Sequence, residues 1–137
     1  GNLDMMALSE LLLADSGEWL GKLRILSLSS CSLGRAGISL ILQILGHPAC
    51  TLESLDLSHQ LIGPEGMQTL LPALRRLRKL QLHGCDLGDE GGITLKEFLQ
   101  NSALEHLDLQ NNFIGFKTCT QLSHAAASHR PPIKLEL

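Results

Sequence analysis

Aromatic residues are scarce in this chain. They make up 3% of its 137 residues, with one tryptophan, three phenylalanines and no tyrosine. Most cores mix large aromatic and aliphatic side chains, whereas leucine takes most of these places here. The shortage of stacking residues also argues against a surface for single-stranded nucleic acid. This bias toward one aliphatic residue predicts a repeated packing unit.

Long apolar runs are absent as well. No stretch approaches the roughly eighteen apolar residues that a membrane span needs, and the first residues lack the pattern of a secretion signal. These absences predict a soluble, intracellular chain with no membrane partner, in the cytoplasm or alternatively in the nucleus. The net charge of -3 also disfavours nucleic acid as a partner. The short basic run at 75–79 is better explained by the predicted end of a helix, where positive charge complements the helix dipole.

Four segments share the pattern L-x-x-L-x-L-x-x-[N/C/Q]-x-[L/I]. They begin at Leu23, Leu52, Leu77 and Leu104, so their starts are 29, 25 and 27 residues apart. Side chains alternate along a strand, so the two leucines of L-x-L point inward and the residues between them point outward. Stacked copies predict a parallel sheet with strands centred on 26–28, 55–57, 80–82 and 107–109.

The position after each predicted strand favours a small polar side chain, because the chain bends inward there and exposes backbone groups to hydrogen bonding. It holds cysteine or asparagine in three repeats, and Gln60 departs from this pattern. A G-x-x-G motif then follows in the first three repeats, where glycine allows a tight turn and Pro64 suits the first turn of a helix. A helix is expected after each motif. The fourth repeat has Thr118 in place of the second glycine, and its helix is expected near 118–127.

The ends of the chain carry parts of further repeats. Residues 4–20 have a helical pattern with no L-x-x-L-x-L before them, and residues 132–137 match the start of a fifth strand with Leu135 and Leu137 inward. The predicted organisation is one domain over 1–137: a partial repeat at 1–22, repeats at 23–51, 52–76, 77–103 and 104–131, and the start of a strand at 132–137.

Repeats of this length with L-G-x-x-G before a full helix resemble the leucine-rich repeats of the ribonuclease-inhibitor class, over nearly the whole chain. The resemblance implies an α/β fold: a right-handed βα solenoid, or horseshoe segment, with a parallel sheet on the concave face and helices on the convex face. The class includes enzyme inhibitors, sensor domains of nucleotide-binding immune receptors, GTPase activators and assembly scaffolds. Repeats of ubiquitin-ligase substrate adaptors are similar. The fold alone does not choose among these functions.

The four cysteines are expected to be reduced. Cys31 and Cys85 hold the same position two repeats apart, which places them roughly 9 to 10 Å from each other and beyond disulfide reach. Both are expected to be buried. Cys50 and Cys119 lie elsewhere, and the chain has no C-x-x-C motif.

No cofactor, metal or catalytic activity is expected. Three histidines lie near two aspartates on the predicted face, but they occupy three different strand offsets, which disfavours a metal site. Ser58 and His83 share an offset on adjacent repeats, with Asp56 nearby. An open sheet supplies neither an oxyanion hole nor a pocket that excludes water, so this is not predicted to be a hydrolase.

The outward residues of the strands form columns across the concave sheet. The first column alternates in sign and is expected to be an internal charge ladder: Arg24, Glu53, Arg78 and Glu105. The other columns are mixed and mildly acidic, which suits a protein partner. With the adjacent rim they give the predicted partner-binding residues: Ser27, Ser54, Asp56, His59, Lys79, Gln81, His83, His106, Asp108, Gln110 and Phe113.

A ridge follows the Asn/Cys position of each repeat, at Ser32, Leu61, Asp86 and Phe113. Leu61 and Phe113 either contact a partner or fold over the neighbouring turn, and the sequence leaves both readings open.

The predicted function is a protein-interaction scaffold or recognition module that binds a protein on the concave face and adjacent rim, as part of a larger protein. The alternatives are a ligand-sensing or autoinhibitory segment of a nucleotide-binding receptor, a GTPase activator and a ubiquitin-ligase substrate adaptor. The chain lacks the phosphate-binding G-x-x-x-x-G-K-[ST] motif of such a receptor. It is expected to be monomeric within its parent protein, with end-to-end association as an option for the isolated segment.

Overall fold

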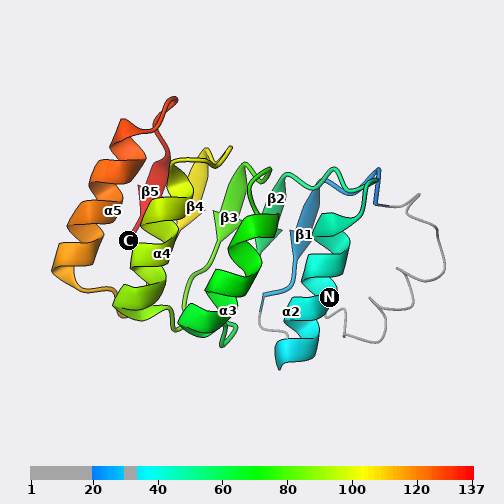
Figure 1. Cartoon of the computed structure of the whole chain (residues 1–137), viewed down its shortest axis with the longest axis horizontal. Helices are drawn as coiled ribbons and strands as arrows, with labels where there is room; N and C mark the ends of the chain where they lie inside the picture. The colour runs from blue at the N-terminus through cyan, green and yellow to red at the C-terminus, as the bar shows by residue number, and fades with distance from the viewer. Residues whose placement is uncertain (1–19, 30–33) are drawn as a thin grey trace.

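The computed structural model describes residues 20–29 and 34–137. It confirms the βα solenoid: five parallel strands form one sheet in chain order, and helices alternate with them along the sequence (Figure 1). The helix expected over 4–20 falls almost wholly outside the described residues, as do Cys31 and Ser32 of the predicted cysteine pair and ridge.

Each strand is three residues long and has a leucine at its centre. The strands are β1 (Ile25–Ser27), β2 (Ser54–Asp56), β3 (Lys79–Gln81), β4 (His106–Asp108) and β5 (Lys134–Glu136). In the first four, the second leucine of L-x-L lies just beyond the strand and is also buried. The fifth strand forms as expected at the edge of the described sheet, where Leu137 is 41% exposed.

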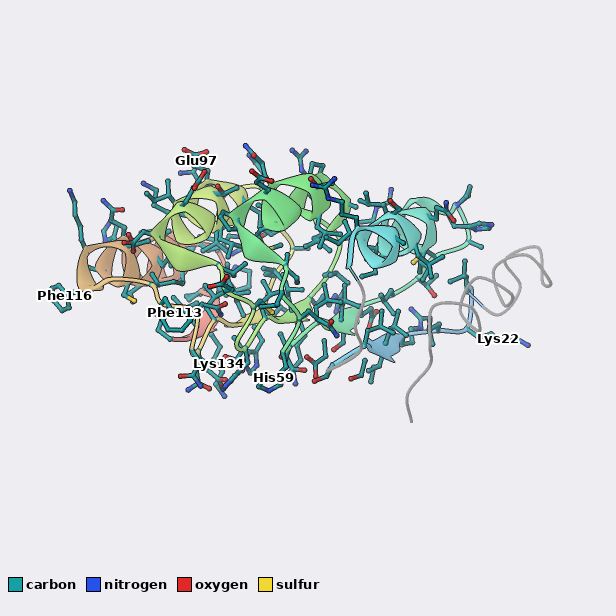
Figure 2. All side chains as sticks on the ribbon, turned by 90° about the horizontal axis from the view of Figure 1, so that it is seen from below. Lys22, His59, Glu97, Phe113, Phe116 and Lys134 are labelled. Atoms are coloured by element: carbon teal, nitrogen blue, oxygen red, sulfur yellow. The ribbon has the colours of Figure 1, made fainter. Side chains whose placement is uncertain are left out.

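The helices lie on one side of the sheet. They are α2 (Gly34–Gly46), α3 (Gly63–Leu70) with the 3₁₀ turn η1 (Leu71–Ala73), α4 (Gly88–Leu99) and α5 (Phe116–Ser128). Figure 2 shows the helices arching over the sheet, so the opposite face of the sheet is the inner, uncovered one. The sequence predicted that the basic residues at 75 and 76 end a helix. They follow η1 in a turn instead. No helix in the described part of the chain is long and apolar enough to cross a membrane.

Leucines fill the space between the two layers. The central leucines Leu55, Leu80 and Leu107 have no exposed surface, and Met67 of α3 and Leu95 of α4 are equally buried. Removing such side chains from water is the main force that holds a solenoid together, because each repeat covers the apolar face of its neighbour.

The residue three positions after the second leucine of L-x-L connects one repeat to the repeat before it. In three repeats its side chain donates a hydrogen bond to the backbone carbonyl of the preceding repeat's second leucine: Gln60 to Leu28, Cys85 to Leu57 (3.1 Å) and Asn112 to Leu82 (2.7 Å). Gln60 therefore performs the same task as the other two residues despite its longer side chain. The position requires a donor that reaches a buried carbonyl, since an unpaired buried carbonyl is costly.

Candidate functional site

The uncovered face of the sheet carries the outward residues that the sequence predicted. Strand register aligns them in two columns, one of which reads Ile25, Ser54, Lys79, His106 and Lys134 and the other Ser27, Asp56, Gln81, Asp108 and Glu136. His59 and Lys134 mark this side in Figure 2, opposite Glu97 on the helical side. The structure therefore brings the predicted strand residues together on one surface.

Two aspartates end their strands in the same way. The Oδ1 atom of Asp56 accepts a hydrogen bond from the backbone N–H of Ser58, and Oδ1 of Asp108 accepts one from Gln110, each at 2.9 Å. This local bond fixes the turn that follows a strand. Repeat three has Gln81 at the equivalent position. The aspartates thus shape the backbone as well as contributing charge to the face.

Asp108 and Ser58 are less accessible than predicted. Their exposed fractions are 7% and 6%, so the expectation that both stand free on the surface is wrong. His83, two residues beyond β3, contacts both of them: its Nδ1 lies 3.9 Å from Oδ2 of Asp108, and its backbone N–H donates to the Ser58 hydroxyl oxygen at 3.2 Å. Charge reversal at Asp108 is therefore expected to lower stability, unlike a change at a truly exposed position.

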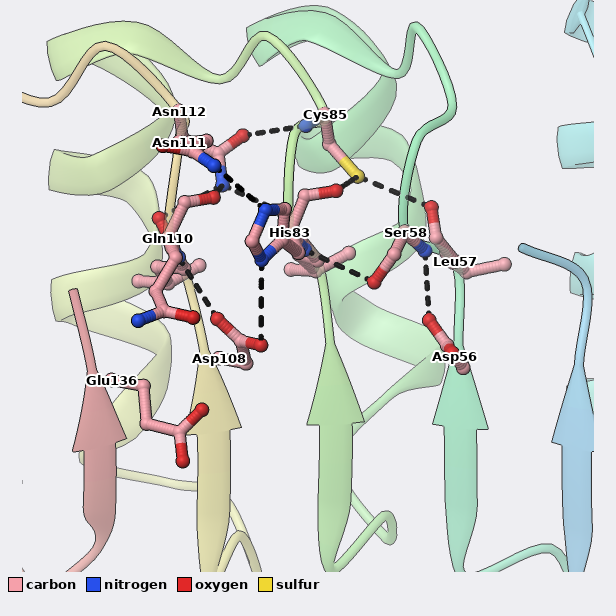
Figure 3. A network of polar contacts seen from close by, with 12 residues as sticks. Asp56, Leu57, Ser58, His83, Cys85, Asp108, Gln110, Asn111, Asn112 and Glu136 are labelled. Atoms are coloured by element: carbon pink, nitrogen blue, oxygen red, sulfur yellow. Dashed lines mark hydrogen bonds and ion pairs between the residues drawn. The ribbon is translucent and has the colours of Figure 1, made fainter. Parts of the chain in front are cut away.

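His83 is the centre of a polar cluster (Figure 3). Its Nε2 lies 2.8 Å from Nδ2 of Asn111, and the centroid of its ring is 5.1 Å from that of His59. Alongside this cluster, His106 pairs with Glu136, with 3.3 Å between Nε2 and Oε1. The sequence prediction included the histidines but missed Asn111 and Glu136. Glu136 shares a column with Asp108, so aligning the predicted fifth strand with the other repeats could have identified it.

Within the described residues, only one ion pair of the predicted charge ladder forms. Arg24 and Glu53 lie 3.5 Å apart, and both side chains are about half exposed. Glu53, Arg78 and Glu105 stand next to each other through backbone hydrogen bonds of 2.7 to 2.8 Å, but their side chains form no ion pair within the described residues. Solvent screening makes such exposed pairs weak, so backbone proximity does not impose side-chain pairing.

Three large apolar side chains project into solvent at the loop edge, where the chain passes from strand to helix. Leu61, Phe113 and Phe116 are 90%, 84% and 89% exposed, so Leu61 and Phe113 do not fold over a neighbouring turn. Phe116, the first residue of α5, was missed by the sequence analysis. The other three repeats have Arg35, Pro64 or Asp89 directly after the first glycine of the motif. A large apolar residue at this position could therefore have identified Phe116 from the sequence.

Phe113 also has an unusual backbone. Its φ is 56°, in the left-handed region that large side chains avoid. A left-handed residue with a Cβ costs roughly 1–2 kcal/mol. Its exposed ring shows no compensating burial within the described structure.

Cys85 is buried, as predicted, and no disulfide joins Cys50, Cys85 or Cys119, the cysteines that the structure describes. Burial raises the pKa of the Cys85 thiol from 9.0 to about 11, and the carboxylates of Asp56 and Asp108 add to the increase. The thiol is therefore a hydrogen-bond donor in the repeat connection and a poor nucleophile.

Alkylation of the native protein at pH 8 is expected to modify Cys50 and Cys119 well before Cys85. With a pKa near 11, only about one Cys85 thiol in a thousand is ionised at that pH, and burial also blocks the reagent. Mass spectrometry of peptides after short iodoacetamide pulses measures each rate. Unfolding in urea should bring the Cys85 rate up to that of the others, and equal rates in the native protein would contradict the assignment.

Known proteins share these repeats. A family model described as Leucine Rich repeat matches residues 49–71 and 74–96. The human NACHT, LRR and PYD domains-containing protein 12 is 39% identical over 105 residues, which cover 73% of this chain and 10% of that protein. The pig ribonuclease inhibitor is 34% identical over 120 residues, covering 84% of this chain and 26% of the inhibitor. The rat NLR family member X1 is 32% identical over 99 residues, covering 71% of this chain and 10% of that protein.

The chain thus spans between a tenth and about a quarter of the length of these relatives. The two family matches cover β2 with α3 and β3 with most of α4. This chain is a leucine-rich-repeat protein of the ribonuclease-inhibitor-like class.

Proposed function

We propose that this chain is a protein-recognition module that binds a protein partner on the uncovered face of the sheet and the adjoining loop edge. The observation that carries the proposal is that two suitable surfaces lie next to each other. A five-stranded polar face lies opposite the helices, and the exposed side chains of Leu61, Phe113 and Phe116 lie at the loop edge that follows the strands. Five strands cover about 20 Å across, so the face alone is small and the loop edge adds the apolar area that an interface needs.

The chemistry of the face favours a protein over a polyanion. Lys79 and Lys134 lie in one column, while Asp56 and Glu136 lie in the next, so charges of both signs alternate over short distances. A polyanion needs a continuous positive stripe, whereas a protein surface supplies both signs. A hydrolytic reading gains no support, because the Ser58 hydroxyl is buried and already accepts a backbone N–H.

The two phenylalanines are the proposed anchors. Aromatic side chains that fill a partner's pocket commonly carry most of the energy of a protein interface. Asp86 has the same φ of 56° at the equivalent position of the preceding repeat, so the left-handed backbone of Phe113 belongs to the repeat turn, and the exposure of its ring is what supports the anchor role. Phe116 lies three residues further along the same edge, so both rings can enter one partner surface.

Replacing Phe113 with asparagine is expected to weaken partner binding at least tenfold while raising the free energy of unfolding by about 0.5–1 kcal/mol, since asparagine tolerates a left-handed backbone. Phe116→Ala should weaken binding at unchanged stability, because Phe116 is exposed at the start of a helix. Calorimetric titration and urea unfolding measure the two effects. Lost stability in Phe113→Asn would show that the ring packs internally and would remove it from the binding site.

The sheet face is tested in the same assay with Lys79→Glu, which changes a half-buried residue in the middle of the sheet. The control is Arg75→Glu, which makes the same charge change at an exposed turn on the helical side. Ribonuclease is the first partner to test, because two of the relatives are named ribonuclease inhibitor. Partners identified by cross-linking follow. If a bound partner is equally sensitive to both variants, it does not use the face.

A second candidate function is supported by the relatives whose names contain NACHT or NLR. The chain would then be a ligand-sensing or autoinhibitory segment of a nucleotide-binding receptor. The parent protein of such a segment should carry a G-x-x-x-x-G-K-[ST] motif and bind a nucleotide. Sequencing the parent transcript and measuring ATP binding by the full protein decide between this function and a free-standing recognition module.

A further inference from the structure

A groove of about 890 Å³ lies between α4 and α5 on the helical side, away from the proposed face. The two helices run side by side (Figure 1). Lys96 and Gln100 of α4 line one wall, Gln121 and His124 of α5 line the other, and Arg130 lies at the end of α5. This volume falls within the range of roughly 300–1,000 Å³ typical of ligand sites.

The charge of the groove is opposite to that of the chain. The chain carries a net charge of -3, yet Lys96 and Arg130 line the groove and none of the described residues that line it is Asp or Glu. The neighbouring groove between α3 and α4 contains both Arg75 and Glu97. Lys96 and Glu97 are adjacent in sequence but face different grooves, so α4 separates a positive groove from a balanced one.

Several hydrogen-bond donors in the groove have no partner. The side chains of Lys96, Gln100, Gln121 and His124 make no hydrogen bond or ion pair with any described residue. Arg130 uses Nη1 to approach the carbonyls of Ala127 and His129 at 3.4 Å, and the other two nitrogens of its guanidinium carry three further N–H donors. The groove therefore presents two cationic groups and several side-chain donors that bond to no described residue, and none of its described lining side chains is Asp or Glu.

Helix dipoles account for only part of this arrangement. Lys96 lies in the last turn of α4 and Arg130 follows α5, where positive charge is favourable. Arg75 and Arg76 likewise follow η1 after α3, yet the groove that Arg75 lines also contains Glu97, whereas no acidic residue among the described ones lines the groove between α4 and α5. A dipole also does not explain the unpartnered amides of Gln100 and Gln121, which are uncharged.

We propose that the groove between α4 and α5 binds an acidic peptide segment of a protein partner. Carboxylates accept hydrogen bonds from ammonium, guanidinium, amide and imidazole donors, which are the groups present. The lining positions on α5 extend from Thr120 to Ser128, a rise of about 12 Å. About four residues of extended chain span that distance, so a short segment with several carboxylates fits. This site is separate from the sheet face and does not depend on the proposed function.

The test uses fluorescein-labelled hexaglutamate, titrated with the full chain and followed by anisotropy at low salt. Lys96→Glu should weaken binding at least fivefold, because it places a carboxylate in the groove. The matched control is Lys117→Glu, which makes the same charge change at an exposed lysine outside the groove, and it should change affinity less than twofold. Lys96 has no partner in the described chain, so its replacement is expected to leave folding intact, and circular dichroism checks this.

Amide chemical shifts of the ¹⁵N-labelled chain locate the bound peptide. Shifts confined to the second halves of α4 and α5 support the proposal, and shifts on the strands overturn it. Absence of binding up to millimolar peptide, or equal weakening in both variants, also overturns it. Tripolyphosphate is tested in parallel: if it competes at equal charge concentration with the same shifts, the groove is a general anion site and the assignment to a peptide is wrong. None of these outcomes affects the test of the sheet face.

Discussion

Replacing Asn112 with alanine is expected to lower the free energy of unfolding by about 3–5 kcal/mol. Asn112 is 2% exposed and connects two repeats. Its Nδ2 donates to the carbonyls of Leu82 at 2.7 Å and Leu109 at 3.0 Å, and its Oδ1 accepts the N–H of Cys85 at 2.8 Å. Its Oδ1 also accepts the N–H of Leu87 at 3.3 Å. Alanine fills none of these roles, so four buried backbone groups lose this partner at once. Each orphaned group costs about 1–3 kcal/mol.

Urea unfolding with linear extrapolation measures this loss. Asn101→Ala is the control, because Asn101 is exposed and its side chain makes no hydrogen bond in the described structure; it should change stability by less than about 0.5 kcal/mol. Asn112→Cys should recover part of the loss, since repeat three uses Cys85 to donate to the equivalent carbonyl. A loss below about 1 kcal/mol for Asn112→Ala would mean that these backbone groups find other partners.

The sequence predicted those parts of the structure that the repeat enforces. The leucine spacing located the parallel strands within one residue, because a shift of one position would turn every inward leucine outward. The same register correctly placed Asp56 and Gln81 side by side on the uncovered face. The G-x-x-G motif located the helix starts, since glycines 63 and 88 adopt the left-handed backbone that the turn requires.

Features that arise between repeats were not predictable from the pattern within one repeat. Asp108 was expected to be exposed, but it is buried and lies beside His83, which follows the adjacent strand. Whether a side chain leans toward its neighbour depends on rotamers that the sequence does not specify. The charge ladder failed for a related reason: register brings Glu53 and Arg78 together, but exposed side chains gain too little from pairing to be fixed there.

The residues proposed to bind a partner divide in the same way. Phe113 was found because it occupies a defined repeat position, whereas Phe116 lies where the repeat consensus is silent. The groove between α4 and α5 has no counterpart in the consensus, because its walls come from the outer surfaces of helices, where the fold constrains residue type least. Function-specific residues of a solenoid are therefore expected at positions that the repeat leaves free.

Gly92→Ala is expected to lower the free energy of unfolding by about 1–3 kcal/mol, although alanine favours helix more than glycine does. Gly92 is buried in α4, which packs closely on α5. A Cβ at this position would lie 2.8 Å from the Cγ2 methyl of Thr118, closer than two carbons can approach. Thr118 is β-branched and therefore has few rotamers to escape into, so the two helices must separate.

The double variant Gly92→Ala/Thr118→Ser identifies the cause. Serine lacks the methyl group that clashes, so the double variant should recover most of the stability that Gly92→Ala loses, and the coupling energy should exceed about 0.5 kcal/mol. Gly46→Ala is the control at the end of α2, where an added Cβ meets no atom within 4 Å; it should be neutral or slightly stabilising. Thermal and urea unfolding of the wild type, Gly92→Ala, Thr118→Ser and the double variant give the coupling energy, and Gly46→Ala is measured beside them. Additive losses in the double variant would show that Thr118 does not limit the approach of α4 and α5, and the cost of Gly92→Ala would then lie in the neighbouring side chain of Ile114, 3.5 Å away.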